Sequence, residues 1–184
     1  LLLSVEPQGK ASSFGKSEFA IINAPKDAEF KRENSMKCVS LDGQRLEIKL
    51  HYVKNKTSNT SLKVVVYSPY IILNKTGENI IISEKGNITK VDGGRSEYVP
   101  DPTLFSFANG TDPSNRAIVK INDSNWTDPL SFDAIGLSTS YRAQINGRQS
   151  EFNFGLEINE GSGKYRHTKV VSMVPRYVFR NKLD

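Results

Sequence analysis

Large apolar residues recur at every second position in several short stretches of this chain. In RLEIKLHY (45–52), one face carries four of them, Leu46, Ile48, Leu50 and Tyr52. YRAQI (141–145) and EFNFGLEI (151–158) follow the same pattern. Alternation with a period of two places apolar side chains on one side of a β-strand. No stretch has the apolar spacing of an amphipathic helix, so these segments predict strands.

Short polar segments rich in glycine, asparagine and aspartate separate the predicted strands. They include LDGQ, VDGG, ANGTDP, INGR and EGSG, which contain residues that tolerate a positive φ angle. Strands at short spacing, with turns and no helices between them, are typical of antiparallel sandwiches. The predicted fold class is therefore all-β, built from antiparallel β-sandwich modules.

The chain contains an internal repeat. YIILNK (70–75) is similar to YVFRNK (177–182), and their asparagines, Asn74 and Asn181, lie 107 positions apart. A repeat of this length predicts tandem structural modules of about a hundred residues each. We expect residues 1–66 to form the C-terminal part of one module, residues 67–173 one full module period, and residues 174–184 the opening strand of the next.

The repeated motif predicts a strand that passes from one module into the following one. Pro69 and Pro175 have no N–H to donate to a sheet, so they should mark a bend where strand pairing changes. Asn74 and Asn181 follow the next apolar run, where an asparagine side chain can hydrogen-bond backbone groups across a sharp turn. We expect these asparagines to hold the turn, with direct peptide binding as the alternative.

Composition excludes little by itself. Hydrophobic residues make up 37% of the chain and charged residues 24%, which is ordinary for a soluble domain. The single cysteine, Cys38, cannot form a disulfide within the chain and favours a reducing compartment. Seven Asn-x-Ser/Thr sequons keep a glycosylated, extracellular module open as an alternative. No hydrolase, nucleotide-binding or metalloprotease motif occurs, so we expect neither an enzyme nor a metal or other cofactor.

Positive charge gathers near the C-terminal end. The formal net charge is +5, and residues 164–182 contain six lysines and arginines and no acidic residue. Such a segment could face anionic lipid, which makes a peripheral membrane or anionic-lipid-binding β-module the alternative function. The candidate lipid-headgroup residues are Lys164, Arg166, Lys169 and Arg176.

The two asparagine motifs also carry a family resemblance. YSPYIILNKTG (67–77), together with VPRYVFRN (174–181), resembles the repeated adaptor-binding region of the vacuolar protein sorting-associated protein 13 family of bridge-like lipid-transfer proteins. SMKCVSLDGQRLEIKLHYVKN (35–55) and NWTDPLSFDAIG (125–136) are similar to that region as well. The resemblance implies a non-catalytic array of β-sandwich modules, each with a characteristic asparagine, here Asn74 and Asn181.

The resemblance further implies binding of proline-containing (Pro-x-Pro) peptides from organelle-specific adaptor proteins, which direct the lipid-transfer protein to membrane contact sites. The chain would then be cytoplasmic and peripheral at organelle membranes such as those of the endosome, mitochondrion or vacuole, with indirect membrane contact and no nucleic-acid partner. Addition of the peptide to a sheet edge is the expected mode. The candidate peptide contacts are Tyr67, Tyr70, Trp126, Tyr177 and Phe179.

Overall fold

The computed structural model describes residues 2–9, 13–22, 33–54, 62–93, 100–107, 114–135, 138–144 and 151–177. Strands joined by turns dominate these ranges, which confirms the all-β fold class. None of the helices in the described ranges is long and apolar enough to cross a membrane. The strands form two units, and each unit has a hydrophobic core of its own.

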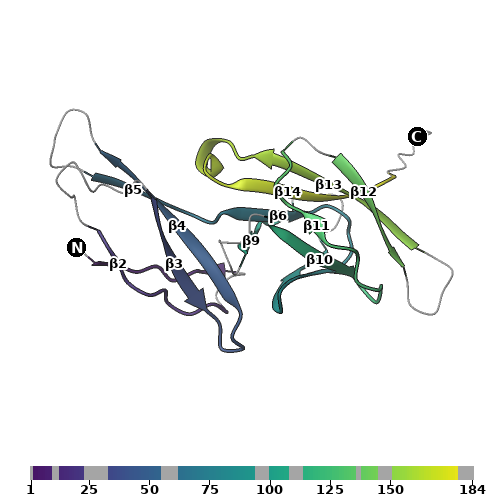
Figure 1. The fold of residues 1–184 in the computed structure, drawn as a ribbon, viewed down its shortest axis with the longest axis horizontal. Helices are drawn as coiled ribbons and strands as arrows, with labels where there is room; N and C mark the ends of the chain where they lie inside the picture. Colours follow the sequence, from purple (N-terminus) through teal and green to yellow (C-terminus); the bar gives the residue numbers. More distant parts are fainter. Residues whose placement is uncertain are drawn as a thin grey trace, which may run out of the picture.

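The first unit lies at one end of the molecule (Figure 1). Its strands are β1 (Leu2–Leu3), β2 (Ala20–Ile21), β3 (Glu33–Val39), β4 (Arg45–Lys54) and β5 (Leu62–Tyr67). β1 pairs with β2, while β3, β4 and β5 form an antiparallel sheet in chain order. The predicted alternation in β4 is confirmed, since Leu46, Ile48, Leu50 and Tyr52 are all buried. They form the first core together with residues of β2 and β3.

The second unit is a β-sandwich. Its strands are β6 (Tyr70–Asn74), β7 (Ile80–Glu84), β8 (Asn87–Val91), β9 (Thr103–Phe105), β10 (Arg116–Ile121), β11 (Leu130–Ser131), β12 (Ser138–Gln144), β13 (Glu151–Glu160) and β14 (Lys169–Pro175). One sheet has the order β12-β13-β14-β6-β9, and the other β11-β10-β7-β8. Buried side chains from both sheets, including Phe105, Phe132 and Phe154, make up the second core.

The chain enters the second unit through a short break in β-structure. β5 ends at Tyr67 and β6 begins at Tyr70, with only Ser68 and Pro69 between them (Figure 1). The predicted change of pairing at Pro69 is confirmed, because β5 pairs with β4 whereas β6 pairs with β14 and β9. Pairing of β6 with β14 is the only parallel pairing among the described strands. We call the segment from Tyr67 to Tyr70 the strand crossing.

The meander β12-β13-β14 repeats the meander β3-β4-β5. β3 and β12 are both 7 residues long, and β4 and β13 are both 10 residues long. The residue numbers that bound β12 are those of β3 plus 105, and those that bound β13 are those of β4 plus 106. The first residue of β14 is the first residue of β5 plus 107. The pairing agrees as well, since Lys54 faces Leu62 as Glu160 faces Lys169. This equivalence supports the modular interpretation, while the boundaries at 66/67 and 173/174 stay a prediction.

Candidate functional site

Asn74, the last residue of β6, is 1% exposed and uses both ends of its side-chain amide. The Nδ2 group donates to the carbonyl oxygens of Glu78 at 2.7 Å and Asp92 at 3.1 Å, with a longer contact to Val91 at 3.4 Å. Oδ1 accepts from the backbone N–H of Thr76 at 3.0 Å and from its hydroxyl at 2.7 Å. The side chain thus joins the end of β6, the turn before β7 and the end of β8, and this geometry supports a turn-holding role.

Two glycines complete this turn. Gly77 has a φ of +80°, a region that disfavours residues with a side chain. Gly93 lies so close to it that a Cβ on Gly93 would stand 2.5 Å from the Gly77 carbonyl oxygen. The sequence of the VDGG segment predicts a turn. It does not predict the contact between Gly77 and Gly93, because this contact depends on how the end of β8 lies relative to the end of β6.

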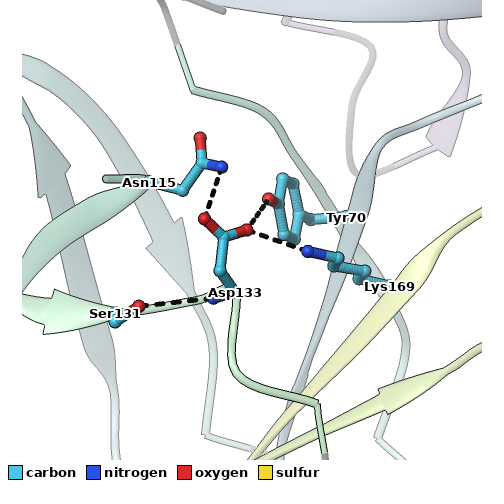
Figure 2. Close-up of polar contacts among 5 residues, drawn as sticks. All are labelled: Tyr70, Asn115, Ser131, Asp133 and Lys169. Atoms are coloured by element: carbon cyan, nitrogen blue, oxygen red, sulfur yellow. Dashed lines mark hydrogen bonds and ion pairs between the residues drawn. The ribbon is translucent and has the colours of Figure 1, made fainter. Parts of the chain in front are cut away.

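A polar network surrounds the carboxylate of Asp133 beside the strand crossing (Figure 2). Its Oδ1 accepts from Lys169 Nζ at 2.8 Å and from the hydroxyl of Tyr70 at 3.2 Å. Its Oδ2 accepts from Asn115 Nδ2 at 2.8 Å. The Lys169 ammonium also lies 5.7 Å from the centre of the Tyr70 ring. The network therefore fixes Lys169, at the start of β14, against Tyr70, at the start of β6.

The network shifts two pKa values in opposite directions. Burial raises the pKa of the Asp133 carboxyl, but the hydrogen bonds from Lys169 and Asn115 lower it by more, so it lies below its ordinary value of 3.8. Burial, together with the Asp133 charge, raises the pKa of the Tyr70 hydroxyl far above 10. At neutral pH the carboxylate is therefore charged and the Tyr70 hydroxyl keeps its proton and donates it.

Two pockets at the strand crossing share Tyr67 as a lining residue. The polar crossing pocket, of about 280 Å³, is lined by Glu47, Lys49, Tyr67, Pro69, Tyr70, Phe107, Asn115, Asp133, His167 and Lys169. The apolar crossing pocket, of about 340 Å³, is lined by Val5, Glu6, Pro7, Ile48, Val66, Tyr67, Ser68, Ile71, Leu104, Lys164, Tyr165 and Thr168. Both pockets take residues from the two units, so neither unit provides this hollowed surface alone.

The only two histidines of the chain meet at the rim of this surface. The ring centres of His51, from β4, and His167, which precedes β14, are 4.8 Å apart, and Tyr67 lies 5.3 Å from His167. Arg166 donates from Nε to His167 Nε2 at 3.0 Å, which requires an unprotonated nitrogen there. The pKa of His167 lies below 6.5, mainly because of burial. The charge of Arg166 and, to a smaller extent, His51 lower it further.

The candidate peptide contacts fall into three groups. Tyr67 and Tyr70 meet at the polar crossing pocket, although Tyr70 is only 7% exposed and presents little beyond its hydroxyl end. Trp126 lies in the loop between β10 and β11, and Tyr177 follows β14, with exposed fractions of 43% and 64%. Phe179 lies outside the described residues, as does Asn181.

The basic candidates lie near both ends of β14. Lys164 and Arg166 precede β14, whereas Arg176 follows it, and a strand of 7 residues spans roughly 20 Å. Lys169 is occupied by its ion pair with Asp133. The anionic-lipid alternative therefore stays a prediction.

Several residues of the crossing carried no sequence signal. Asp133 and Asn115 sit in loop-like segments, and nothing local indicates that β14 brings Lys169 to them.

Cys38 is buried in the first core, as its apolar setting indicates, and burial raises its pKa. No group of three or more histidine, cysteine, aspartate or glutamate side chains that could hold a metal ion occurs within the described ranges.

Comparison with known proteins places the chain in a family. The family described as "Vacuolar-sorting associated protein 13, adaptor binding domain" matches residues 1–184. The chain therefore belongs to the vacuolar protein sorting-associated protein 13 family and lies in its adaptor-binding domain, which by family is an interaction module and not an enzyme.

Individual relatives agree with this assignment. The chain is 40% identical to the intermembrane lipid transfer protein VPS13 of Chaetomium thermophilum over 99% of its own length and 6% of that protein. It is 27% identical to human intermembrane lipid transfer protein VPS13D over 66% of its length and 3% of that protein. With Dictyostelium discoideum vps13E the identity is 23%, over 97% of the chain and 5% of the relative. The chain thus spans a small part of each curated relative.

Proposed function

We propose that this chain binds a Pro-x-Pro adaptor peptide across Tyr67, with one proline in each crossing pocket. The observation that carries the proposal is that the two pockets share this one side chain. In an extended peptide, side chains two positions apart point to the same side and lie roughly 6–7 Å from each other. Two adjacent pockets with a common aromatic lining residue suit this spacing.

The lining of the pockets fits the chemistry of such a peptide. Tyr67, Pro69 and Phe107 offer apolar surface to a proline ring in the polar crossing pocket, and Ile48, Leu104 and Tyr165 offer it in the apolar one. Proline has no backbone N–H, so a peptide with prolines hydrogen-bonds mainly through its carbonyl groups. These carbonyl groups accept from donors of the protein. Lys49 lines the polar crossing pocket and can supply such a donor, whereas the ammonium of Lys169 is bound to Asp133.

In the whole protein, this binding would attach a lipid-transfer protein to an organelle through a membrane-bound adaptor. The chain would then work in the cytoplasm, at membrane contact sites and without direct insertion into lipid. Family membership in the adaptor-binding domain supports this role.

The test is a titration of a fluorescent Pro-x-Pro peptide into the chain and its variants, measured by anisotropy. We expect Tyr67→Ala to weaken binding by about tenfold or more, since an aromatic anchor is commonly a binding hot spot. Tyr177→Ala and Trp126→Ala are matched controls on exposed aromatics away from the crossing. A peptide with both prolines replaced by alanine should not bind. Unchanged affinity for Tyr67→Ala would overturn the site, and no binding of the proline peptide would overturn the function.

A further inference from the structure

The loop between β13 and β14 lines both crossing pockets. It comprises residues 161–168, and we call it the β13–β14 loop. Tyr165 and Thr168 line the apolar crossing pocket, and His167 lines the polar one. The N–H of Thr168 donates to the Tyr165 carbonyl at 2.8 Å, so these residues form one compact turn. A displacement of this loop would therefore change both pockets together.

His167 attaches the β13–β14 loop to the first unit. Its ring centre lies 4.8 Å from that of His51 on β4 and 5.3 Å from that of Tyr67 at the end of β5. On the side of the loop, its Nε2 accepts a hydrogen bond from Arg166 Nε at 3.0 Å. One imidazole ring thus contacts the loop itself and two strands of the first unit.

The hydrogen bond from Arg166 requires a neutral His167. A nitrogen that accepts a hydrogen bond carries no proton, and a protonated imidazole has two N–H donors and no acceptor. A proton on Nε2 would therefore end the bond from Arg166 and set two positive charges against each other. The lowered pKa of His167 agrees with this geometry. Acid therefore weakens the contacts that hold the loop in place.

Charged and titratable groups face His167 from each element packed around it. They are Glu33 on β3, Glu47, Lys49 and His51 on β4, Tyr67 on β5, Arg166 in the loop itself, Lys169 on β14 and Asp133 beside it. Glu33 favours the proton on His167, and its Oε1 lies 3.7 Å from His51 Nδ1. Ordinary carboxyl, lysine and tyrosine groups keep their charge state between about pH 7.5 and 5.5, whereas histidine does not. A pH response of the loop in this range therefore depends on the two histidines of the chain.

We propose that a proton on His167 separates the β13–β14 loop from His51 and Tyr67 and thereby releases a peptide held at the strand crossing. The crossing is then an acid-sensitive switch, because one side chain controls loop residues in both pockets. Peptide release rests on the proposed function, whereas the loop movement does not. Because only the neutral form binds, the apparent affinity falls with the neutral fraction, which is about one-tenth at one pH unit below the folded pKa of His167. The dissociation constant there is about tenfold higher than at pH 7.5.

The test of peptide release is a series of anisotropy titrations between about pH 7.5 and 5.5, with a fluorescent Pro-x-Pro peptide that contains no histidine, aspartate or glutamate. The folded pKa of His167 is measured by NMR on the same chain. We expect the dissociation constant to rise about tenfold at one pH unit below that pKa. His167→Gln should flatten this rise whatever its affinity at pH 7.5, because glutamine stays neutral and keeps an oxygen acceptor for Arg166. His51→Gln is the matched control and should keep the rise. A flat profile for His51→Gln would assign the effect to His51 and overturn the proposal.

The loop movement is measured without peptide, from the hydrogen exchange of single amides relative to an unfolded chain at the same pH. The N–H groups of Thr168 and Lys169, which donate to the carbonyls of Tyr165 and Pro69, should lose protection as His167 is protonated. The amides of β10, in the other sheet, should keep theirs.

The possible failures of the two proposals are distinguishable. No peptide binding at pH 7.5 would overturn the proposed function, and the switch would then be judged by the protection of Thr168 and Lys169 alone. A dissociation constant or a protection that does not change with pH would overturn the switch and leave the peptide site standing. Global unfolding at about pH 5.5, seen by circular dichroism, would overturn the switch as well, because the loop moves within a folded chain.

Discussion

Thr168 donates from its hydroxyl to the carbonyl oxygen of Ser68 at 2.8 Å, although the two residues are 100 positions apart. Both are buried, with exposed fractions of 5% and 7%. The next residue of each segment continues the contact, since the N–H of Lys169 donates to the carbonyl of Pro69 at 2.9 Å. The start of β14 is thereby fixed to the strand crossing, and both crossing pockets form around this junction.

Replacement of Thr168 by valine should destabilise the chain by about 1–3 kcal/mol, because Ser68 would keep a buried carbonyl group without its donor. Valine has nearly the same shape, so packing is preserved. The measurement is urea denaturation followed by circular dichroism. Thr89→Val, at a partly exposed threonine of β8, is the control and should change the free energy of unfolding by less. Equal stability of the two variants would contradict a structural role of this hydrogen bond.

Asn74→Ser should lower the melting temperature more than any exposed substitution. The shorter side chain cannot reach Glu78 and Asp92 together, so buried carbonyl groups lose their donors, at a cost of about 1–3 kcal/mol each. Asn125→Ser, at an exposed asparagine, is the control for the chemical change. An unchanged melting temperature for Asn74→Ser, combined with lost peptide affinity, would instead assign Asn74 to the binding surface.

Acidification should loosen the strand crossing through His167. A histidine whose pKa is lowered in the folded state stabilises the fold fully above the unfolded pKa of about 6.5, and this contribution is lost as the pH falls from there toward the lower folded value. The free energy of unfolding should therefore fall between about pH 7 and the folded pKa of His167. His167→Gln should remove this part of the pH dependence. A folded-state titration of His167 above 6.5, measured by NMR, would contradict the prediction.

Lys169→Met should raise the pKa of Asp133, since Lys169 supplies the strongest of the contacts that lower it. A carboxyl with a lowered pKa stabilises the fold above its unfolded value of 3.8 and loses this effect as the pH falls through its folded value. The variant should thus be less stable at neutral pH and show a weaker acid dependence. Carbon-detected NMR titration of the Asp133 carboxyl measures the shift directly. Tyr70→Phe, which removes a weaker contact, should shift it less.

The strands were predictable because their signal is local. In β4 every second residue faces one core, so the sequence alternates between apolar and polar residues. The sequence motif that contains Asn74 occurs twice, and its first copy marks where a strand passes between units. Sheet order depends instead on contacts between distant segments. Parallel pairing of β6 with β14 brings Tyr70, Lys169 and Asp133 together, and no local pattern encodes it. For the same reason the local sequence does not show how far Tyr70, a candidate peptide contact, is buried between the two sheets.

NMR mapping of the peptide site tests the central claim most directly. A Pro-x-Pro peptide is added to isotope-labelled chain, and the backbone amide shifts are followed residue by residue. We expect the largest changes at Tyr67, His167 and Lys169, because these residues line the polar crossing pocket. Changes confined to the Trp126 loop or to Tyr177, with the crossing unperturbed, would contradict the account.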